Sequence, residues 1–349
     1  MILLNDRTVS APTASEYSRR YKAARAEAAR MGTASRSKLA EVYVEASAQA
    51  ARVVVDTLER GLSKLTADRW AVVEAKLKGA ADSLAQGTET VAHALVGQAA
   101  PLFPEVDAQF LYQAMRYTGA KGITKEGLGR VVAGVSSRVV ESMTTRLWSD
   151  GYTFSDRIWK TGLIEEGGLK GQPISVRGDW MERLRMTVAA GIAQGRDPVK
   201  IAKDIQVYTT DGKIALGKRW GSLERGTAEF AKRIPGRLDW RAQRLVRSVL
   251  GDAIREASAL SGDANPACDG LFDWVLSMGR QHSDICDEWA AGGPYKSEDL
   301  PEGHPNDMCH VQPHLREMGT FLGDLKRWAK GEGVDYLDEW YAGTYKAAA

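Results

Sequence analysis

The sequence predicts a mainly α-helical protein, in which a helical N-terminal domain precedes an α+β domain with small β-hairpins and a Cys/His loop. Apolar residues recur at three- and four-residue steps over roughly the first 150 residues, which is the helical period. The turn pair Asp211-Gly212 lies between two short runs of strand-forming residues and predicts a β-hairpin. All three cysteines and four of the five histidines lie between Cys268 and His314, which predicts a ligand-bearing loop.

Length and composition limit the classes of protein to consider. With 349 residues, the chain is long enough for two domains of ordinary size. Its net charge of only +2 indicates that the protein as a whole is not an electrostatic binder of nucleic acid. Three cysteines favour a reducing compartment over a disulfide-rich secreted scaffold. No signal peptide and no apolar run of roughly 18 residues is recognisable, so we expect a chain made in the cytoplasm that does not enter a membrane.

The first 40 residues carry eight basic side chains against three acidic ones. Within them, residues 18–31 have a helix-forming, Ala-rich composition without a wide apolar stripe. We therefore expect an exposed or partner-dependent helix in a basic N-terminal arm. Two interpretations stay open, a solvated basic face or contact with an acidic protein or with DNA. The side chains that would make such a contact are Arg19, Arg20, Lys22, Arg25 and Arg30.

Further helices are expected in order through the rest of the N-terminal half, because each segment has apolar residues at helical spacing. They are placed at residues 37–65, after an N-cap at Thr66, and at 89–99, 106–117 and 126–149. The break between the third and fourth helices contains Pro101 and Pro104. Together these helices form a predicted domain over residues 1–160 that shows no recognisable chemistry.

A Gly-rich stretch over residues 161–178 is expected to be a linker. The predicted domain after it, at 179–314, begins with two short helices joined by a turn at Gly195. Their order is that of a helix-turn-helix, but the second helix carries only one basic pair, so plain packing is favoured. An amphipathic helix at 238–260 precedes the Cys and His residues, and a helical, aromatic-rich tail occupies 315–349.

The tail has more aromatic side chains than a solvated segment needs, including Trp328 and the run from Tyr336 to Tyr341. Tyr and Trp are enriched both in cores and in interface anchors. Folding back onto the body and anchoring a partner are therefore equally compatible with the sequence.

Two short segments of the Cys- and His-rich region offer metal ligands on either side of a Gly- and Pro-rich loop. Thiolate and neutral imidazole are ligands that suit zinc, and a tetrahedral site needs four ligands. The favoured set is Cys286, His304 and Cys309, with His282, Asp284 or Asp307 as the fourth ligand. The alternative, that these cysteines are small buried apolar residues, stays open. A catalytic metal is disfavoured because the chain has no His-Glu-x-x-His motif.

The same region resembles a known family in the order and spacing of its motifs. Trp274 is followed by His282, Asp284-Ile285-Cys286-Asp287, Gly293-Pro294-Tyr295, Leu300-Pro301 and His304-Pro305-Asn306-Asp307-Met308-Cys309. This pattern is similar to that of the head morphogenesis or minor capsid family of tailed bacteriophages, the group that resembles the F protein of phage Mu. The resemblance covers roughly residues 180–313 and is specific only in the last 40 or so of them.

The resemblance implies a virion protein without enzymatic activity, present in few copies. Such a protein associates with the portal and the major capsid protein during head assembly in the host cytoplasm and can accompany the DNA. Two departures weaken the match. Asp307 replaces the first Cys of the family's Cys-x-Cys, and Arg247-Ser248-Val249 replaces the usual Arg-Thr-Glu. Two other classes remain as alternatives, a metal-dependent hydrolase and a zinc-stabilised nucleic-acid-binding protein.

Overall fold

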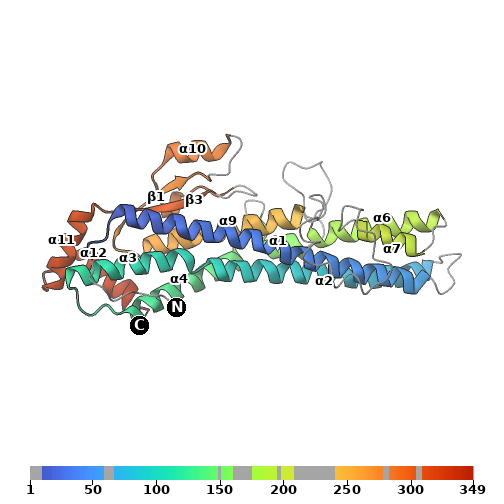
Figure 1. Cartoon of the computed structure of the whole chain (residues 1–349), viewed down its shortest axis with the longest axis horizontal. Coiled ribbons are helices and arrows are strands. Elements are labelled where there is room, and N and C mark those ends of the chain that lie inside the picture. Colours follow the sequence, from blue (N-terminus) through green and yellow to red (C-terminus); the bar gives the residue numbers. More distant parts are fainter. Residues whose placement is uncertain are drawn as a thin grey trace. The chain divides into compact units, whose positions relative to one another are not determined.

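The computed structural model describes residues 10–58, 67–147, 151–159, 175–194, 198–207, 240–277, 283–303 and 309–348. Over these residues the protein is mainly helical and has one three-stranded antiparallel sheet (Figure 1), so the predicted mainly α class is confirmed. Within the same ranges no helix is long and apolar enough to cross a membrane. The hairpin expected around Asp211-Gly212 lies outside the described residues.

The chain divides into two compact units, and each unit is built from segments that are distant in sequence. Unit 1 consists of residues 1–31, 95–145 and 247–349, and unit 2 consists of residues 32–94 and 146–246. Both units therefore combine residues from the first 160 with residues from later segments.

The first two helices are longer than the apolar pattern suggested. α1 (Ala14–Leu58) is one helix where two were expected, at 18–31 and 37–65. α2 (Ala67–Ala99) likewise joins the helix expected after Thr66 to the one expected at 89–99. The reason is that small polar residues continue the buried stripe. Ser35 in α1 and Thr88 in α2 are buried, and each hydroxyl donates to a carbonyl of its own helix, so neither interrupts the burial.

The start of α1 is not an exposed arm. Tyr17 and Tyr21 are 1% and 0% exposed, and Ala24 and Ala28, one and two turns further on, are also buried. The expectation of an exposed or partner-dependent helix over residues 18–31 is therefore wrong. The apolar stripe was missed because it consists of tyrosines and alanines, which count weakly as apolar residues in a search for a wide hydrophobic face.

The described part of unit 2 also includes the helices α5 (Phe154–Trp159), α6 (Val176–Ala193) and α7 (Pro198–Val207). α6 is held against α2 by two ion pairs, from Arg177 to Asp82 (2.5 Å) and from Arg185 to Glu74 (3.1 Å). α7 buries Ala202 in a cluster with Ala51 and Val55 of α1. The α6–α7 pair thus uses its buried faces for packing within unit 2, as the favoured interpretation predicted.

In unit 1 the helices α3 (Leu102–Thr118) and α4 (Lys125–Thr145) pack together. The part of α9 (Trp240–Asp263) that belongs to this unit contacts α3 through Ser261, which donates to Asp107. α3 buries one apolar face, and its last turn ends at Gly119, whose φ of 75° is the left-handed conformation that favours glycine at a C-cap. All three elements agree with the helices predicted at 106–117, 126–149 and 238–260.

The sheet has the order β2-β1-β3, with β1 (Cys268–Val275) between β2 (Tyr295–Lys296) and β3 (His310–Leu315). β1 and β3 pair from Val275↔His310 to Cys268↔Leu315, and the register shifts between Cys268 and Phe272. Gly270 lies in that irregularity with a φ of 86°, a conformation that favours glycine. α10 (Ile285–Gly292) connects β1 to β2.

The aromatic tail folds back onto unit 1. It forms α11 (Met318–Ala329), α12 (Asp335–Trp340) and a short π-helix, η3 (Tyr341–Tyr345). The indole N–H of Trp340 donates to the Ala264 carbonyl (2.8 Å), and the Tyr345 hydroxyl accepts from the Thr124 N–H (2.8 Å). The sequence left open whether the tail folds back onto the body or anchors a partner. These side chains fold back onto the body.

The packing of Tyr345 on α4 predicts opposite effects for two neighbouring glycines. A Cβ at Gly127 would overlap the Tyr345 ring and hydroxyl, whereas a Cβ at Gly129 meets no atom within 4 Å. We expect Gly127→Ala to lower the free energy of unfolding by about 2 kcal/mol, because the tail must shift. Gly129→Ala should raise it by about 0.5–1 kcal/mol through helix propensity. Urea unfolding of both variants tests this, and equal effects would contradict the tail placement.

Candidate functional site: the cysteine cluster and the buried polar network

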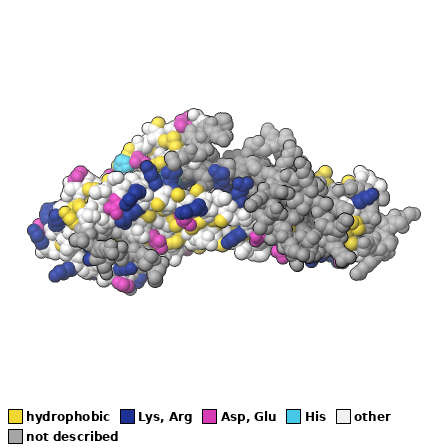
Figure 2. All heavy atoms as spheres, viewed as in Figure 1, with side chains coloured by type: hydrophobic (Ala, Val, Ile, Leu, Met, Phe, Trp, Pro, Cys, Tyr) yellow, Lys and Arg dark blue, Asp and Glu magenta, His cyan; other side chains and the backbone are white. Residues whose placement is uncertain are grey.

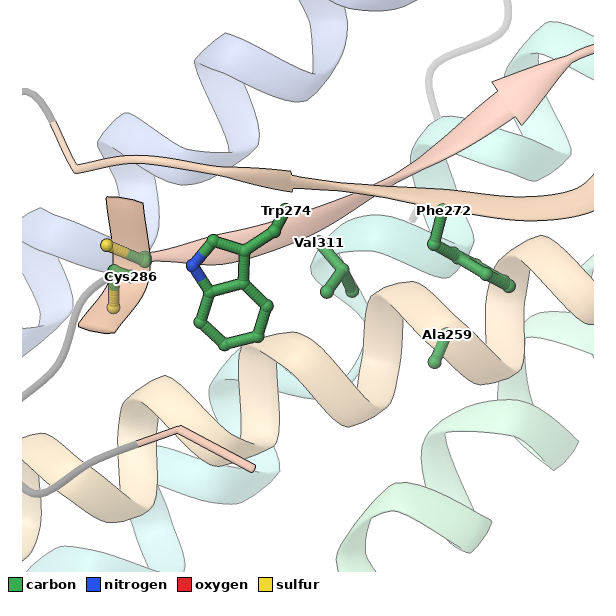
Figure 3. Close-up of a cluster of buried hydrophobic side chains, with 6 residues drawn as sticks. Ala259, Phe272, Trp274, Cys286 and Val311 are labelled. Carbon is green, nitrogen blue, oxygen red and sulfur yellow. The ribbon is translucent and has the colours of Figure 1, made fainter. Parts of the chain in front are cut away.

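The motif segments meet in one buried group of side chains, which we call the cysteine cluster: Ala259, Phe272, Trp274, Cys286, Cys309 and Val311. Figure 3 shows Phe272, Trp274 and Val311 projecting from the strands toward the helix that carries Ala259. The partly buried side chains of Tyr295 and Leu300 pack against this cluster. The structure thus brings together two of the predicted metal ligands, Cys286 and Cys309, which are 23 positions apart in sequence.

Cys309 is held by contacts on both its backbone and its sulfur. The Ser277 N–H donates to the Cys309 Sγ (3.3 Å), and Arg255 Nη1 donates to the Cys309 carbonyl (3.0 Å). Burial lowers the pKa of Arg25 of α1, and the neighbouring Cys309 group opposes this shift.

Cys286 lies in the first turn of α10, and its position is fixed by the helix N-terminus. Asp284 is the N-cap, and its Oδ1 accepts from the Cys286 N–H (2.9 Å), while Asp287 Oδ2 accepts from the Asp284 N–H (2.9 Å). This capping box satisfies donors that the helix leaves unpaired. The carboxylate of Asp284, one of the predicted ligands, therefore caps the N-terminus of α10.

The other predicted ligands, His282, His304 and Asp307, lie outside the described residues. Among the residues that the structure describes, no group of three or more His, Cys, Asp or Glu side chains is placed to hold a metal ion. Within those ranges the predicted site is thus represented by Cys286, Cys309 and the N-cap residue Asp284. None of the three cysteines forms a disulfide.

Cys268 belongs to a different site, a buried polar network centred on Asp107 of α3. The Asp107 carboxylate is 4% exposed and accepts from four side chains. The donors are Tyr17 (2.6 Å), Tyr21 (3.2 Å), Asn265 (3.0 Å) and Ser261. Burial raises the pKa of Asp107, although these four hydrogen bonds oppose the rise.

The network ties three helices together and also reaches the start of β1. The Cys268 Sγ lies 4.0 Å from the Tyr17 hydroxyl. Burial, and then the charge of Asp107, raise the pKa of the Cys268 thiol well above its ordinary value. Cys268 therefore stays a protonated, inert thiol. Sequence reasoning missed this network, because a single Asp in an amphipathic helix looks like a solvated residue.

His310 is a second residue that sequence reasoning set aside. It is 2% exposed, its Nδ1 lies 3.1 Å from the Val275 carbonyl, and its Nε2 is buried without a hydrogen-bond partner. Burial, then the charge of Arg25 and also that of Arg255, lower its pKa to about 3. The side chain is therefore neutral at pH 7, with the Nδ1 proton donated to Val275.

The five predicted contact residues, all on α1, divide into three kinds. Arg20 pairs with Glu16, and Arg30 pairs with Glu27. Arg25 is half-buried beside the cysteine cluster. Arg19 and Lys22 are exposed. On the face that Figure 2 displays, Lys and Arg side chains are interspersed with Asp and Glu. Of the five predicted contact residues, Arg19, Lys22 and Arg30 are exposed, and Arg30 is paired with Glu27.

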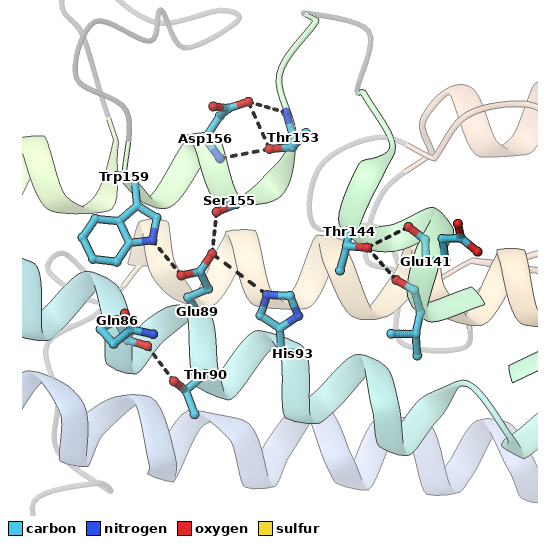
Figure 4. Close-up of polar contacts among 11 residues, drawn as sticks. Gln86, Glu89, Thr90, His93, Glu141, Thr144, Thr153, Ser155, Asp156 and Trp159 are labelled. Atoms are coloured by element: carbon cyan, nitrogen blue, oxygen red, sulfur yellow. Dashed lines mark hydrogen bonds and ion pairs between the residues drawn. The ribbon is translucent and has the colours of Figure 1, made fainter. Parts of the chain in front are cut away.

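A group in unit 2 has the residue types of a hydrolase triad but not its geometry. Glu89 of α2 accepts from the Ser155 hydroxyl and from the Trp159 indole N–H (2.7 Å), and His93 Nε2 lies 4.0 Å from it (Figure 4). A triad needs the imidazole between the hydroxyl and the carboxylate, whereas here the carboxylate contacts the serine directly. The contacts dock α5 onto α2.

Comparisons with known proteins gave no match to any family model, curated protein or solved structure.

Proposed function

We propose that the chain is a minor capsid or head morphogenesis protein of a tailed bacteriophage, which acts during procapsid assembly at the portal. The observation that carries the proposal is the cysteine cluster. Trp274, Cys286, Tyr295, Leu300 and Cys309 come from separate motifs of the family pattern, and all of them lie in or against this one cluster. Residues that share one core have a physical reason to occur together in that order and spacing.

The proposal names the portal and the major capsid protein as partners and the virion head as the location. The test uses portal rings and coat subunits encoded in the same genome, mixed with the purified full chain and separated by sedimentation. We expect the chain to sediment with portal rings, and mass spectrometry of purified heads to detect it in few copies. A chain that binds neither component and is absent from heads would contradict the proposal.

We further propose that the cysteine cluster holds a structural Zn²⁺ ion. Two buried thiols in one cluster, one of them accepting a backbone N–H, suit a thiophilic ion. Cys286 and Cys309 would be the thiol ligands of such an ion. Zinc bound there would tie α10 to the start of β3 and so stabilise the folded chain.

Zinc content provides the direct measurement. We expect about one zinc per chain in protein purified at neutral pH without chelators, because a structural site binds tightly. Cys309→Ser should lose most of it. Cys268→Ser is the matched control, since Cys268 is equally buried but belongs to the Asp107 network, and it should keep the metal. Less than about 0.2 zinc per wild-type chain would rule out the staple.

Arg19, Lys22 and Arg30 are the exposed members of the predicted basic set, and Arg30 is already paired with Glu27, so we assign contact with DNA to Arg19 and Lys22. Each phosphate that a cation neutralises contributes about −0.9 to the slope of log affinity against log salt. Replacing both residues by Ala would therefore reduce the slope by about 2. An unchanged slope would remove α1 as the DNA contact.

A further inference from the structure

An open groove lies along α4 beside the end of α2, and all of its lining residues belong to unit 1. Its volume is about 480 Å³, and it is lined mainly by small residues, among them Gly97, Ala100, Ser136, Ser137 and Thr144. The Ser136 hydroxyl donates to a carbonyl of α4 itself, as does that of Thr144 (Figure 4). A partner packed into this groove would therefore leave neither hydroxyl without a hydrogen bond.

The exposed face of α4 borders this groove. Arg130, Gly134, Ser137 and Glu141 are all exposed and recur at three- and four-residue steps, so they lie on one side of the helix, opposite its buried residues. A Cβ at Gly134 would meet no atom within 4 Å, so this point of the face is open. The face is thus smooth at its centre and has one charged side chain toward each end.

The two charges of this face are placed to pair with a second copy of the same face. Among the described residues, neither Arg130 nor Glu141 has an ion-pair partner. They are about three turns apart, with Gly134 and Ser137 at equal distances between them. When two copies of the helix pack antiparallel about this centre, Arg130 of each copy faces Glu141 of the other, and Gly134 faces Ser137.

The remaining exposed charges of α4 fit the same register. Glu126 would face Thr145, and Arg138 would face Ala133, so no like charges meet. Moving one helix by about one turn would instead bring Arg130 opposite either Arg138 or an uncharged residue. The charge pattern of α4 therefore favours a single antiparallel register.

We propose that this face of α4 is a twofold interface, on which α4 of a second copy of the chain packs antiparallel through two Arg130–Glu141 pairs. Gly134 and Ser137 lie at the centre, where small side chains let two helices approach closely. The groove beside Ser137 and Glu141 provides room for side chains of the partner helix. The inference goes beyond the proposed function, because it concerns contacts between copies of the chain and depends on neither phage partners nor zinc.

Sedimentation equilibrium of the full chain is the first measurement, in reducing buffer because the three cysteines are free. We expect a reversible monomer–dimer equilibrium in the wild type. Arg130→Glu alone and Glu141→Arg alone should each weaken dimerisation by about 10- to 100-fold, since the twofold symmetry turns two attractive pairs into two repulsive ones. An equimolar mixture of the two variants should dimerise again, because an acidic face then meets a basic face.

A bulky side chain at the centre provides the second measurement. Gly134→Leu should abolish the dimer by holding the two helices apart, whereas the folded monomer should tolerate it, because the position is open. Gly323→Leu is the matched control, since Gly323 is an exposed glycine of α11 whose Cβ would also meet no atom within 4 Å, and this variant should dimerise as the wild type does. Circular dichroism should show the same helix content in all variants.

The outcomes test the interface and its register separately. A wild-type chain that stays monomeric at every concentration would overturn the proposal, as would dimers that either Gly134→Leu or the charge variants leave unchanged. If each charge variant weakens the dimer but their mixture does not restore it, the antiparallel pairing of Arg130 with Glu141 is wrong.

Discussion

Asp107→Ala is expected to lower the free energy of unfolding by about 4 kcal/mol, one of the largest effects of a single substitution in this chain. The substitution leaves four donors without their acceptor in a buried site, those of Tyr17, Tyr21, Ser261 and Asn265. A small cavity of about 20 Å³ adjoins Asp107, Ser261 and Asn265, and the rest of its lining is apolar. Because the donors cannot reach bulk water, the full cost of desolvating them remains.

The same change should loosen the start of α1 in particular. Two of the four donors are tyrosines of this helix, and the other two belong to the end of α9 and the turn after it. Amides of residues 14–31 should therefore exchange faster in Asp107→Ala. Denaturant unfolding and amide exchange are the measurements.

Glu105→Ala is the matched control for Asp107→Ala, since Glu105 is a half-buried acid on the same helix. We expect a change of about 0.5 kcal/mol or less for this control. Tyr17→Phe, alone and combined with Asp107→Ala, measures the coupling between the two side chains, which should be about 1–2 kcal/mol. If Asp107→Ala costs less than about 1 kcal/mol, the network is not a determinant of stability.

Periodicity predicted most of the helices correctly, because burial of one face imposes a repeat that is visible in the sequence. α4 and α9 show this most clearly, since their apolar residues are large and regularly spaced. It failed where small residues form the buried face, as around Ser35 in α1, and there it divided one helix into two. The strand β3 was also hidden, since Pro313 argues against a strand. Proline is tolerated there because β3 lies at the edge of the sheet.

The candidate site was predictable in part for a related reason. Cysteines are rare, so their clustering was visible, and Cys286 and Cys309 do share a core. The residues that position them are common types whose role depends on tertiary contacts. Arg255 looked like one of several arginines on an amphipathic helix. Nothing in its local sequence indicates that its guanidinium lies against Gly303 and Cys309.

His310 predicts how stability depends on pH. Its pKa of about 3 in the folded chain is below the ordinary value of 6.5 that applies when the chain unfolds, so the unfolded state binds a proton more readily. His310 therefore does not change the free energy of unfolding above pH 6.5. As the pH falls from 6.5 toward 3, protonation of the unfolded chain lowers the free energy of unfolding. At pH 5 the free energy of unfolding should be about 2 kcal/mol lower than at pH 7 on account of His310 alone.

The comparison with His310→Asn isolates this contribution, because Asn retains a donor for the Val275 carbonyl but does not titrate. Chelator is kept in every sample, since Cys309 is adjacent. The other titratable groups are common to both proteins and cancel in the difference. Arg25 faces His310 from α1 and Arg255 from α9, and both charges oppose its protonation. Arg25→Gln should therefore reduce the loss of stability at pH 5. If the difference in free energy of unfolding between the wild type and His310→Asn does not change from pH 7 to pH 5, the His310 imidazole can reach water and the prediction is wrong.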